Sequence, residues 1–134
     1  GFPGIPLALA LPHVQFSLLE STNKKANFLN SSVAALGLRN VTVYPERVED
    51  WLKAHHPDLI TARALASLRN TIPWFAAALS RDTRVLLYKG PDVESQIADA
   101  MQSNRGFRFR IVHTYELPDG LGSRCIVEMS SSKH

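Results

Sequence analysis

Short apolar runs rich in β-forming residues alternate with segments of helical periodicity along most of the chain. The strand-like runs are Val14–Glu20, Val41–Pro45, Asp58–Arg63, Thr83–Lys89, Phe107–Leu117 and Ser123–Met129. Helical patterns separate the first five of these runs, at Lys24–Leu38, Val48–Ala54, Leu68–Leu79 and Val93–Met101, and a short helix is expected after Gly4, ending near Leu11. This alternation predicts an α/β fold with a mostly parallel sheet and helices on both faces.

The end of the chain follows a different pattern. Only the turn-forming segment Pro118-Asp119-Gly120-Leu121-Gly122 joins the last two strand-like runs, so we expect a C-terminal antiparallel hairpin. Gly37 follows an apolar-periodic stretch, where a left-handed helix cap is expected. We therefore expect one domain over residues 1–129, with a frayed tail at residues 130–134.

Composition is that of an ordinary globular domain. Of the 134 residues, 45% are hydrophobic and 20% are charged, and fifteen Lys and Arg against twelve Asp and Glu give a formal charge of +3. A mild positive excess permits nucleic-acid binding without establishing it. The single cysteine, Cys125, excludes an internal disulfide and favours a reducing compartment, so we expect a cytoplasmic protein. No apolar run approaches the roughly 20 residues of a membrane span.

Glycines and an acid mark the first candidate site. Gly1-Phe2-Pro3-Gly4 precedes the short N-terminal helix, where backbone N–H groups can approach an anionic or polar ligand. The run Val14–Glu20 ends in a carboxylate, and nucleotide-binding α/β folds hold ribose hydroxyls with an acid at that place. For either feature alone, a simple turn or a surface Glu is the more ordinary interpretation. Together the two features favour nucleoside binding.

Three further groups follow strand-like runs. Glu46-Arg47-Val48-Glu49-Asp50 could hold an adenine amine, or could be a solvated first helical turn whose acids suit the helix dipole. Arg63 and Lys89 end two successive strands and would form a positive rim, although either could be a lone surface charge.

Metal and nucleophile chemistry has weak support. The side chains of His55 and His56 are adjacent and would diverge by roughly 100° in a helix, so they would not chelate together. Cys125 lies in a strand-like run, where a small core residue is the ordinary interpretation. We therefore expect neither a metal site nor a catalytic thiol.

At these residues the chain resembles the ribosomal RNA small-subunit methyltransferase G family, also called glucose-inhibited division protein B. Gly1-Phe2-Pro3-Gly4-Ile5-Pro6-Leu7-Ala8 matches the second half of the family's cofactor loop. Further matches, in the family's order, are Leu18-Leu19-Glu20-Ser21, Lys24-Lys25 with Phe28-Leu29, Arg47-Val48-Glu49, Arg63-Ala64 with Ala66-Ser67-Leu68, Tyr88-Lys89-Gly90 and Gly122-Ser123-Arg124. The similarity runs from the first residue to about Met129.

The resemblance implies a Rossmann-like enzyme that transfers a methyl group from S-adenosylmethionine to N7 of one guanine in small-subunit (16S) ribosomal RNA. By position, the resemblance assigns Gly1, Phe2, Gly4, Glu20, Val48, Glu49 and Arg63 to the cofactor, with Phe2 in the cofactor loop, Glu20 on the ribose, Val48 and Glu49 on the adenosine and Arg63 near the reaction centre. It assigns Arg47, Lys89 and Arg124 to basic positions that face RNA. The small ribosomal subunit or its RNA would be the partner.

Guanine N7 carries a lone pair and no proton, so its methylation needs no general base and we expect no catalytic acid or base. Alignment of the reacting atoms at about 3–3.5 Å and local electrostatics can supply the catalysis. Two alternatives stay open. One is a Rossmann-like methyltransferase that acts on another substrate, and the other is a non-catalytic RNA-binding module of the same fold.

The chain departs from the family pattern at its beginning. The first half of the glycine loop and the strand before it are absent, as is the family's N-terminal helical region. The resemblance places that strand between the Val14–Glu20 and Asp58–Arg63 strands. These two strands must then pair directly, leave a gap, or accept a strand from another chain. We expect an N-terminally truncated domain that binds S-adenosylmethionine poorly or not at all and that is inactive by itself.

Overall fold

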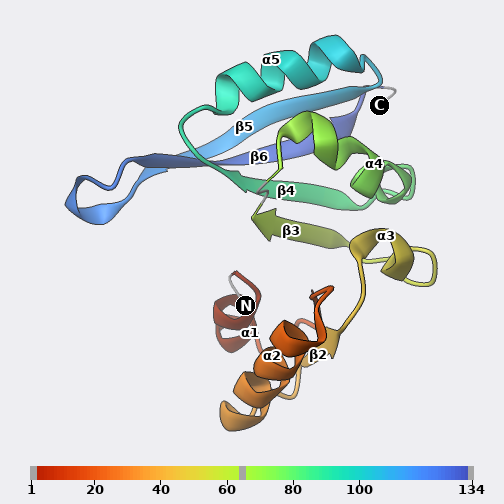
Figure 1. Cartoon of the computed structure of the whole chain (residues 1–134), viewed down its shortest axis with the longest axis vertical. Helices are drawn as coiled ribbons and strands as arrows, with labels where there is room; N and C mark the ends of the chain where they lie inside the picture. The colour runs from red at the N-terminus through yellow and green to blue at the C-terminus, as the bar shows by residue number, and fades with distance from the viewer. Residues whose placement is uncertain (1–2, 64–65, 133–134) are drawn as a thin grey trace. The chain divides into compact units, whose positions relative to one another are not determined.

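The computed structural model describes residues 3–63 and 66–132, and it divides the chain into two compact units, Gly1–His55 and His56–His134 (Figure 1). The first unit contains α1 (Gly4–Ala10), β1 (Phe16–Leu19), α2 (Asn23–Ala35), β2 (Val41–Tyr44) and α3 (Val48–Trp51). The second contains β3 (Leu59–Arg63), α4 (Leu68–Leu79), β4 (Arg84–Lys89), α5 (Val93–Ser103), β5 (Phe107–Glu116), the 3-10 turn η1 (Pro118–Gly120) and β6 (Ser123–Ser131). The predicted strands and helices are all present, with shifted ends.

In the first unit, β1 and β2 form a parallel pair whose register runs from Phe16 opposite Val41 to Leu19 opposite Tyr44. The connecting helix α2 ends at Ala35, three residues before the predicted end. Gly37 adopts a φ of 63°, which confirms the left-handed cap. The amide of Gly37 donates to Ala34 O and that of Leu38 to Val33 O, at 3.1 Å each, which is the hydrogen-bond pattern of a Schellman motif.

Asn40 joins the parts of the first unit. Its side chain is buried, and Nδ2 lies 3.0–3.1 Å from the carbonyl oxygens of Ala8, Leu11 and Val14. Its own carbonyl oxygen accepts from the amide of Phe16 at 2.7 Å. The buried Asn40 therefore satisfies carbonyls in the last turn of α1 and after it with its side chain, and fixes the start of β1 beside β2 with its backbone.

The strands of the second unit form a sheet in the order β3-β4-β6-β5. Strands β3 and β4 are parallel, whereas β6 is antiparallel to both of its neighbours, β4 and β5. The predicted hairpin is thus confirmed, and β6 inserts between β4 and β5. The Leu117 amide donates to Gly122 O at 2.8 Å to close the turn, where Asp119, Gly120 and Gly122 have positive φ.

Alternation along the strands gives this sheet two distinct faces. Side chains with 0–1% exposure lie on one face, and α4 and α5 pack there; they include Val85, Leu87, Val127 and Met129 (Figure 1). A bulge between Ile111 and His113 leaves Val112 as the extra residue of β5. Because the extra residue shifts the alternation of side chains along β5, the bulge determines which side chains of the outer part of the hairpin point to each face of the sheet.

Two further predicted boundaries differ from the structure for clear reasons. Strand β6 continues to Ser131, because Ser130 and Ser131 pair with Arg108 and Phe107, and the Ser132 amide then donates to Gly106 O at 2.9 Å. The prediction of a frayed tail fails for these residues, and residues 133–134 lie outside the described part of the chain. Helix α3 ends at Trp51 instead of Ala54, because the Ala54 amide bonds to Trp51 O in a tighter turn.

Strands β1 and β3 lie in different sheets. Direct pairing of β1 with β3 was one of the three arrangements expected for a sheet that lacks its central strand, and this pairing does not form. In the described residues β1 pairs with β2 and β3 pairs with β4. No helix in the described ranges is long and apolar enough to cross a membrane.

Candidate functional site

The expected site residues fall in both units. Glu20, the turn at Arg47–Glu49, Arg63 and Lys89 end or follow parallel strands, whereas Gly4 begins α1 and Arg124 lies near the start of β6. Gly4 is the first residue of α1, and a Cβ at this position would overlap the Leu18 Cδ2 of β1. The lack of a side chain thus lets the start of α1 approach β1 closely. Gly1 and Phe2, also expected in the cofactor loop, lie outside the described residues.

Glu20 comes directly after β1, as its proposed role requires. Its amide donates to the Tyr44 carbonyl at 3.0 Å, which extends the parallel pairing by one bond and fixes the backbone at this position. The side chain is half-buried. Among the described residues, no hydrogen bond or ion pair engages its carboxylate. A fixed, partly buried acceptor at a strand end can hold a pair of hydroxyl donors.

Val48 and Glu49 form the first turn of α3, which begins four residues after the end of β2. Arg47 precedes them in an extended conformation, and its carbonyl oxygen accepts from the Trp51 amide at 3.0 Å. Val48 is half-buried, whereas Arg47 and Glu49 are exposed. Because β1 and β2 are parallel, this turn and Glu20 lie at the same edge of one sheet.

An aromatic cluster behind this edge was not expected from the sequence. Trp51 is buried and stacks on His55, with ring centroids 4.2 Å apart and an angle of 3° between the planes. Tyr44 meets both rings edge-on. His55 Nδ1 lies 2.9 Å from Trp51 O, so that nitrogen carries the proton of the hydrogen bond. The i, i+4 spacing of Trp51 and His55 was the available signal.

In the second unit, Arg63 is the last residue of β3 and is exposed, opposite Tyr88 in register. Arg124 lies near the start of β6, half-buried, with one guanidinium nitrogen donating to the Ser123 carbonyl at 2.8 Å. Ala64, part of the same motif as Arg63, lies outside the described residues. Both guanidinium groups thus lie on strands that reach the same end of the sheet.

Lys89 differs from expectation. We expected this lysine to face RNA, but its side chain is only 6% exposed and Nζ donates to the Ala66 carbonyl at 3.0 Å. Strand alternation explains this, because Lys89 shares the helix-covered face with Val85 and Leu87. Burial lowers the pKa of Lys89, and the nearby Asp92 and Cys125 oppose this shift. Lys89 ties the segment after Arg63 to β4.

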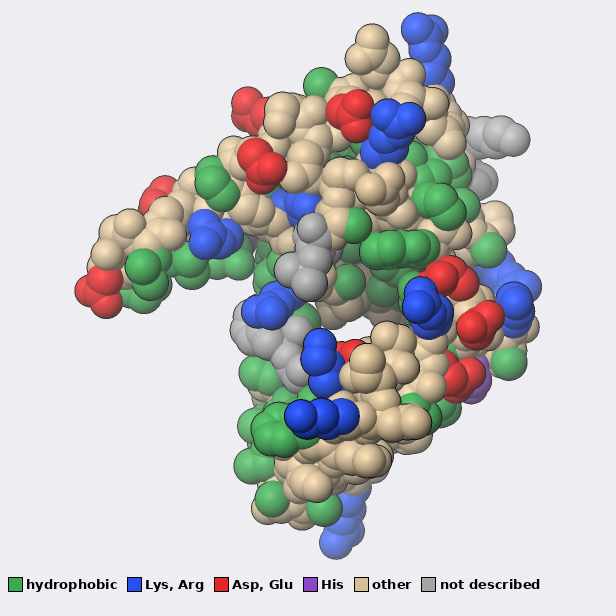
Figure 2. Space-filling model, viewed as in Figure 1, with side chains coloured by type: hydrophobic (Ala, Val, Ile, Leu, Met, Phe, Trp, Pro, Cys, Tyr) green, Lys and Arg blue, Asp and Glu red, His purple; other side chains and the backbone are tan. Residues whose placement is uncertain are grey.

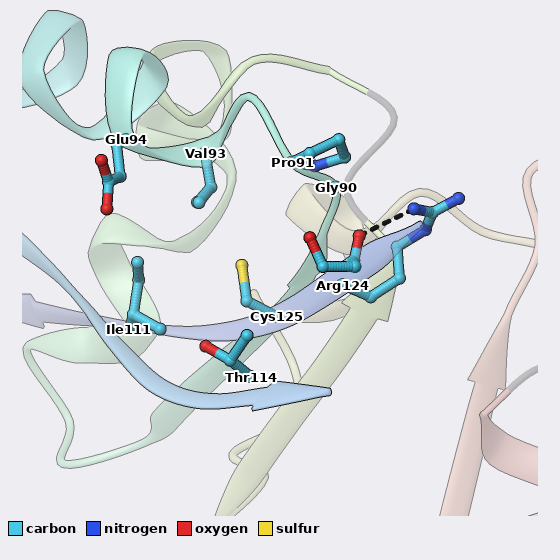
Figure 3. A pocket seen from close by; sticks show the side chains of 9 residues that line it. Gly90, Pro91, Val93, Glu94, Ile111, Thr114, Arg124 and Cys125 are labelled. Atoms are coloured by element: carbon cyan, nitrogen blue, oxygen red, sulfur yellow. Dashed lines mark hydrogen bonds between the residues drawn. The ribbon is translucent and has the colours of Figure 1, made fainter. Parts of the chain in front are cut away.

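A small cavity lies beside Lys89, between the start of α5 and the β5–β6 hairpin (Figure 3). Its volume is about 160 Å³, and its wall includes Cys125, Thr114 and Arg124. Cavities that hold drug-sized ligands are roughly 300–1,000 Å³, so this one does not suit a nucleoside cofactor. Burial raises the pKa of the Cys125 thiol, as expected for a core cysteine. No cluster of metal-ligating side chains occurs within residues 3–63 and 66–132.

Comparison with solved structures defines the class of protein. A precorrin-6y C5,15-methyltransferase from Geobacter metallireducens matches with a TM-score of 0.64 and 14% identity, covering 94% of this chain and 71% of that one. A mutant of MtNAS in complex with S-adenosylmethionine matches with a TM-score of 0.65 and 15% identity, covering 92% and 49%. The fold is that of the Rossmann-like methyltransferases.

Sequence comparison defines the family. Residues 1–117 match the rRNA small subunit methyltransferase G (GidB) family, and the chain belongs to this family. It is 56% identical over 131 residues to ribosomal RNA small subunit methyltransferase G from Solibacter usitatus, covering 96% of this chain and 62% of the relative. The corresponding protein from Marinobacter nauticus is 36% identical over 124 residues, with 92% and 56% covered. The chain thus spans about three-fifths of the length of these relatives.

Proposed function

We propose that the protein formed by this chain, together with the remaining part that its relatives have, methylates N7 of a guanine in small-subunit ribosomal RNA. S-adenosylmethionine would be the methyl donor. One observation carries the proposal: the 56% identity, over nearly the whole chain, to a relative named ribosomal RNA small subunit methyltransferase G. The name of that relative does not say which atom is methylated. The assignment to guanine N7 comes from the resemblance of the sequence motifs.

The residues at the edge of the β1–β2 sheet fit the cofactor. Glu20 offers a half-buried carboxylate that no described group engages, which suits the two ribose hydroxyls. Val48 and Glu49 offer an apolar contact and an acceptor for the adenosine, and Gly4 keeps the start of α1 close to β1. We also assign Gly1, Phe2 and Arg63 to the cofactor.

Bound S-adenosylmethionine supplies a methyl group on a positively charged sulfur. Guanine N7 would form a bond to this methyl group as the sulfur–methyl bond breaks; the sulfur would leave as a neutral thioether, the positive charge would pass to the guanine, and no proton would be released. The side chains would therefore need only to hold the two reactants in line. Glu20 would anchor the ribose, and the backbone around Gly4 would fix the remaining part of the cofactor. Arg63, exposed at the end of β3, would contact the cofactor near the reaction centre.

The RNA would approach on basic side chains at the strand ends. Arg47 is exposed beside the adenosine turn, and Arg124 lies near the end of the β5–β6 hairpin, so we assign both to RNA phosphates. The burial of Lys89 removes it from this set. A single buried cysteine and an RNA substrate favour a cytoplasmic location.

The isolated chain is expected to bind the cofactor weakly. The edge that carries Glu20 and the edge that carries Arg63 belong to separate sheets. The residues assigned to the cofactor are therefore not held on one common sheet. Calorimetry with the 134-residue chain should detect no micromolar binding of S-adenosylmethionine. Micromolar binding would show that this expectation is wrong.

The function is tested with a chimera in which the Solibacter usitatus relative supplies the part outside the matched 131 residues. Tritiated S-adenosylmethionine is incubated with small or large ribosomal subunits that lack the modification. Tritium should enter small-subunit RNA and no large-subunit RNA. A chimera that binds the cofactor but labels neither subunit would refute the proposed methyltransferase activity and favour a non-catalytic RNA-binding module.

A further inference from the structure

The second unit's sheet has a face that its own helices leave uncovered. Helices α4 and α5 pack on the side that contains Leu87 and Val127. Tyr88, Ile126 and Arg110 alternate with such residues and therefore point to the other side, where no described helix of this unit packs. We call this side the open face, made of the side chains of β3–β6 that point away from α4 and α5.

The open face is strongly basic. It carries five arginines and a single acid; the arginines are Arg63, Arg84, Arg108, Arg110 and Arg124. The acid, Glu128, lies between two of the arginines, 3.0 Å from Arg84 Nε and 3.3 Å from a guanidinium nitrogen of Arg110. Those two arginine side chains are still 64% and 76% exposed. Each can therefore bind a further anion while it stays next to Glu128.

Aromatic rings lie beside these charges. His113 and Tyr115 follow the β-bulge, and their rings stack with centroids 5.8 Å apart and an interplanar angle of 21°. Tyr115 is opposite Arg124 in register, and His113 is opposite Ile126, which itself pairs with Tyr88. The outer end of the open face thus combines flat rings with a guanidinium group. The hairpin that carries them extends beyond the helices α4 and α5, and forms the projecting arm of the space-filling view (Figure 1 and Figure 2).

We propose that the open face binds single-stranded RNA, with phosphates on the β5 arginines and an unstacked base on the His113–Tyr115 pair. Arginines spaced along a strand neutralise a phosphate backbone, and flat rings accept bases that have left a helix. The choice of RNA as the nucleic acid rests on the proposed function. The face carries a strong excess of positive charge, so a second copy of the same face would be repelled.

The test measures the affinity of the 134-residue chain for a fluorescently labelled oligouridylate of about 12 nucleotides by anisotropy, at several salt concentrations. Arg108→Gln should weaken binding severalfold and reduce the slope of log K against log salt by about 0.7. Arg69→Gln is the matched control, because Arg69 is 59% exposed on α4 and pairs with Asp99 of α5. This control should bind like the wild type.

Loss of the ring at position 115 tests the stacking. Tyr115→Ala should weaken binding about fivefold or more, whereas Tyr115→Phe should keep the wild-type affinity. Phe28→Ala removes a ring that is 70% exposed on α2 and should have no effect. A second oligonucleotide with the same sugars and phosphates but without bases should bind Tyr115→Ala and wild type equally.

Several outcomes would overturn the proposal: no binding by the wild-type chain, equal effects of Arg108→Gln and Arg69→Gln, or unchanged affinity in Tyr115→Ala. These outcomes are separate from failure of the proposed function. If the chimera methylates small-subunit RNA while the open-face variants bind like wild type, only the open-face proposal fails. If the variants lose binding but the chimera never methylates, only the enzymatic function fails.

Discussion

Lys89 Nζ lies 3.0 Å from the carbonyl oxygen of Ala66 and donates a hydrogen bond to it, which joins the end of β4 to the segment after β3. That segment follows Arg63, so a buried ammonium holds the chain next to an expected cofactor ligand. Lys89→Met should cost about 1–3 kcal/mol of unfolding free energy, because the carbonyl loses a buried charged donor. Urea denaturation measures this loss.

The control for this change is Lys53→Met. Lys53 is 78% exposed and pairs with Asp50 at 3.3 Å, so its loss should cost less than about 0.5 kcal/mol. Hydrogen exchange adds a local readout, since the amides that follow Ala66 should exchange faster in Lys89→Met alone. Equal effects of the two substitutions would contradict the role given to Lys89.

Asn40 should be sensitive to any change of its amide. Asn40→Ala removes the side-chain donor shared by the carbonyls of Ala8, Leu11 and Val14, and we expect a loss of about 1–3 kcal/mol in thermal or urea unfolding. Asn40→Asp should be worse, because a carboxylate would face three carbonyl oxygens. Asn30→Ala, an exposed change in α2, should be neutral or slightly stabilising.

Gly4 and Leu18 should be energetically coupled. Alanine ordinarily favours a helix over glycine by about 1 kcal/mol, but the new methyl would overlap Leu18 Cδ2 and force that side chain to move. We expect Gly4→Ala to destabilise the chain and the same change to be tolerated in a Leu18→Ala background. A double-mutant cycle in unfolding free energy with no coupling would show that the close approach is unimportant.

The pH dependence of stability should report the buried thiol. Burial raises the pKa of Cys125 above its ordinary value of 9.0, so the folded state keeps its proton where the unfolded state loses it. The stability contributed by Cys125 is therefore complete below pH 9.0 and decreases as the pH rises above it. The difference in unfolding free energy between wild type and Cys125→Ala should shift in this direction; a constant difference would contradict it.

The sequence was sufficient to predict most of the fold, because apolar periodicity and turn residues act locally. Gly37 marked the end of α2 and Pro118–Gly120 the hairpin turn, and both are as predicted. The extension of β6 to Ser131 was not predictable from its own residues, since Arg108 and Phe107 of β5 provide the pairing. The predicted length of α3 was too great, because the helical pattern of the sequence continues to Ala54 whereas the backbone forms a tighter turn after Trp51.

The candidate site was predicted less completely. Glu20, Val48 and Arg63 follow strands, and that position could be inferred from the strand pattern alone. The direction of a side chain at a strand end depends on register, and the matching motif alone predicted that Lys89 faces RNA. Its spacing of two residues from Leu87 and four residues from Val85 indicates the buried face. The i, i+4 spacing of Trp51 and His55 brings the two rings near each other. Their stacking also depends on the course of the chain after α3, which the sequence pattern did not define.

The most direct test of the proposed reaction is nucleoside mass spectrometry of small-subunit RNA treated with the chimera and S-adenosylmethionine. The wild-type chimera should produce 7-methylguanosine, and Glu20→Gln should reduce the yield at low cofactor concentration while Glu94→Gln, on α5, should not. Methylation at another atom, or 7-methylguanosine formed equally well by the Glu20 variant, would contradict the site and the chemistry assigned to it.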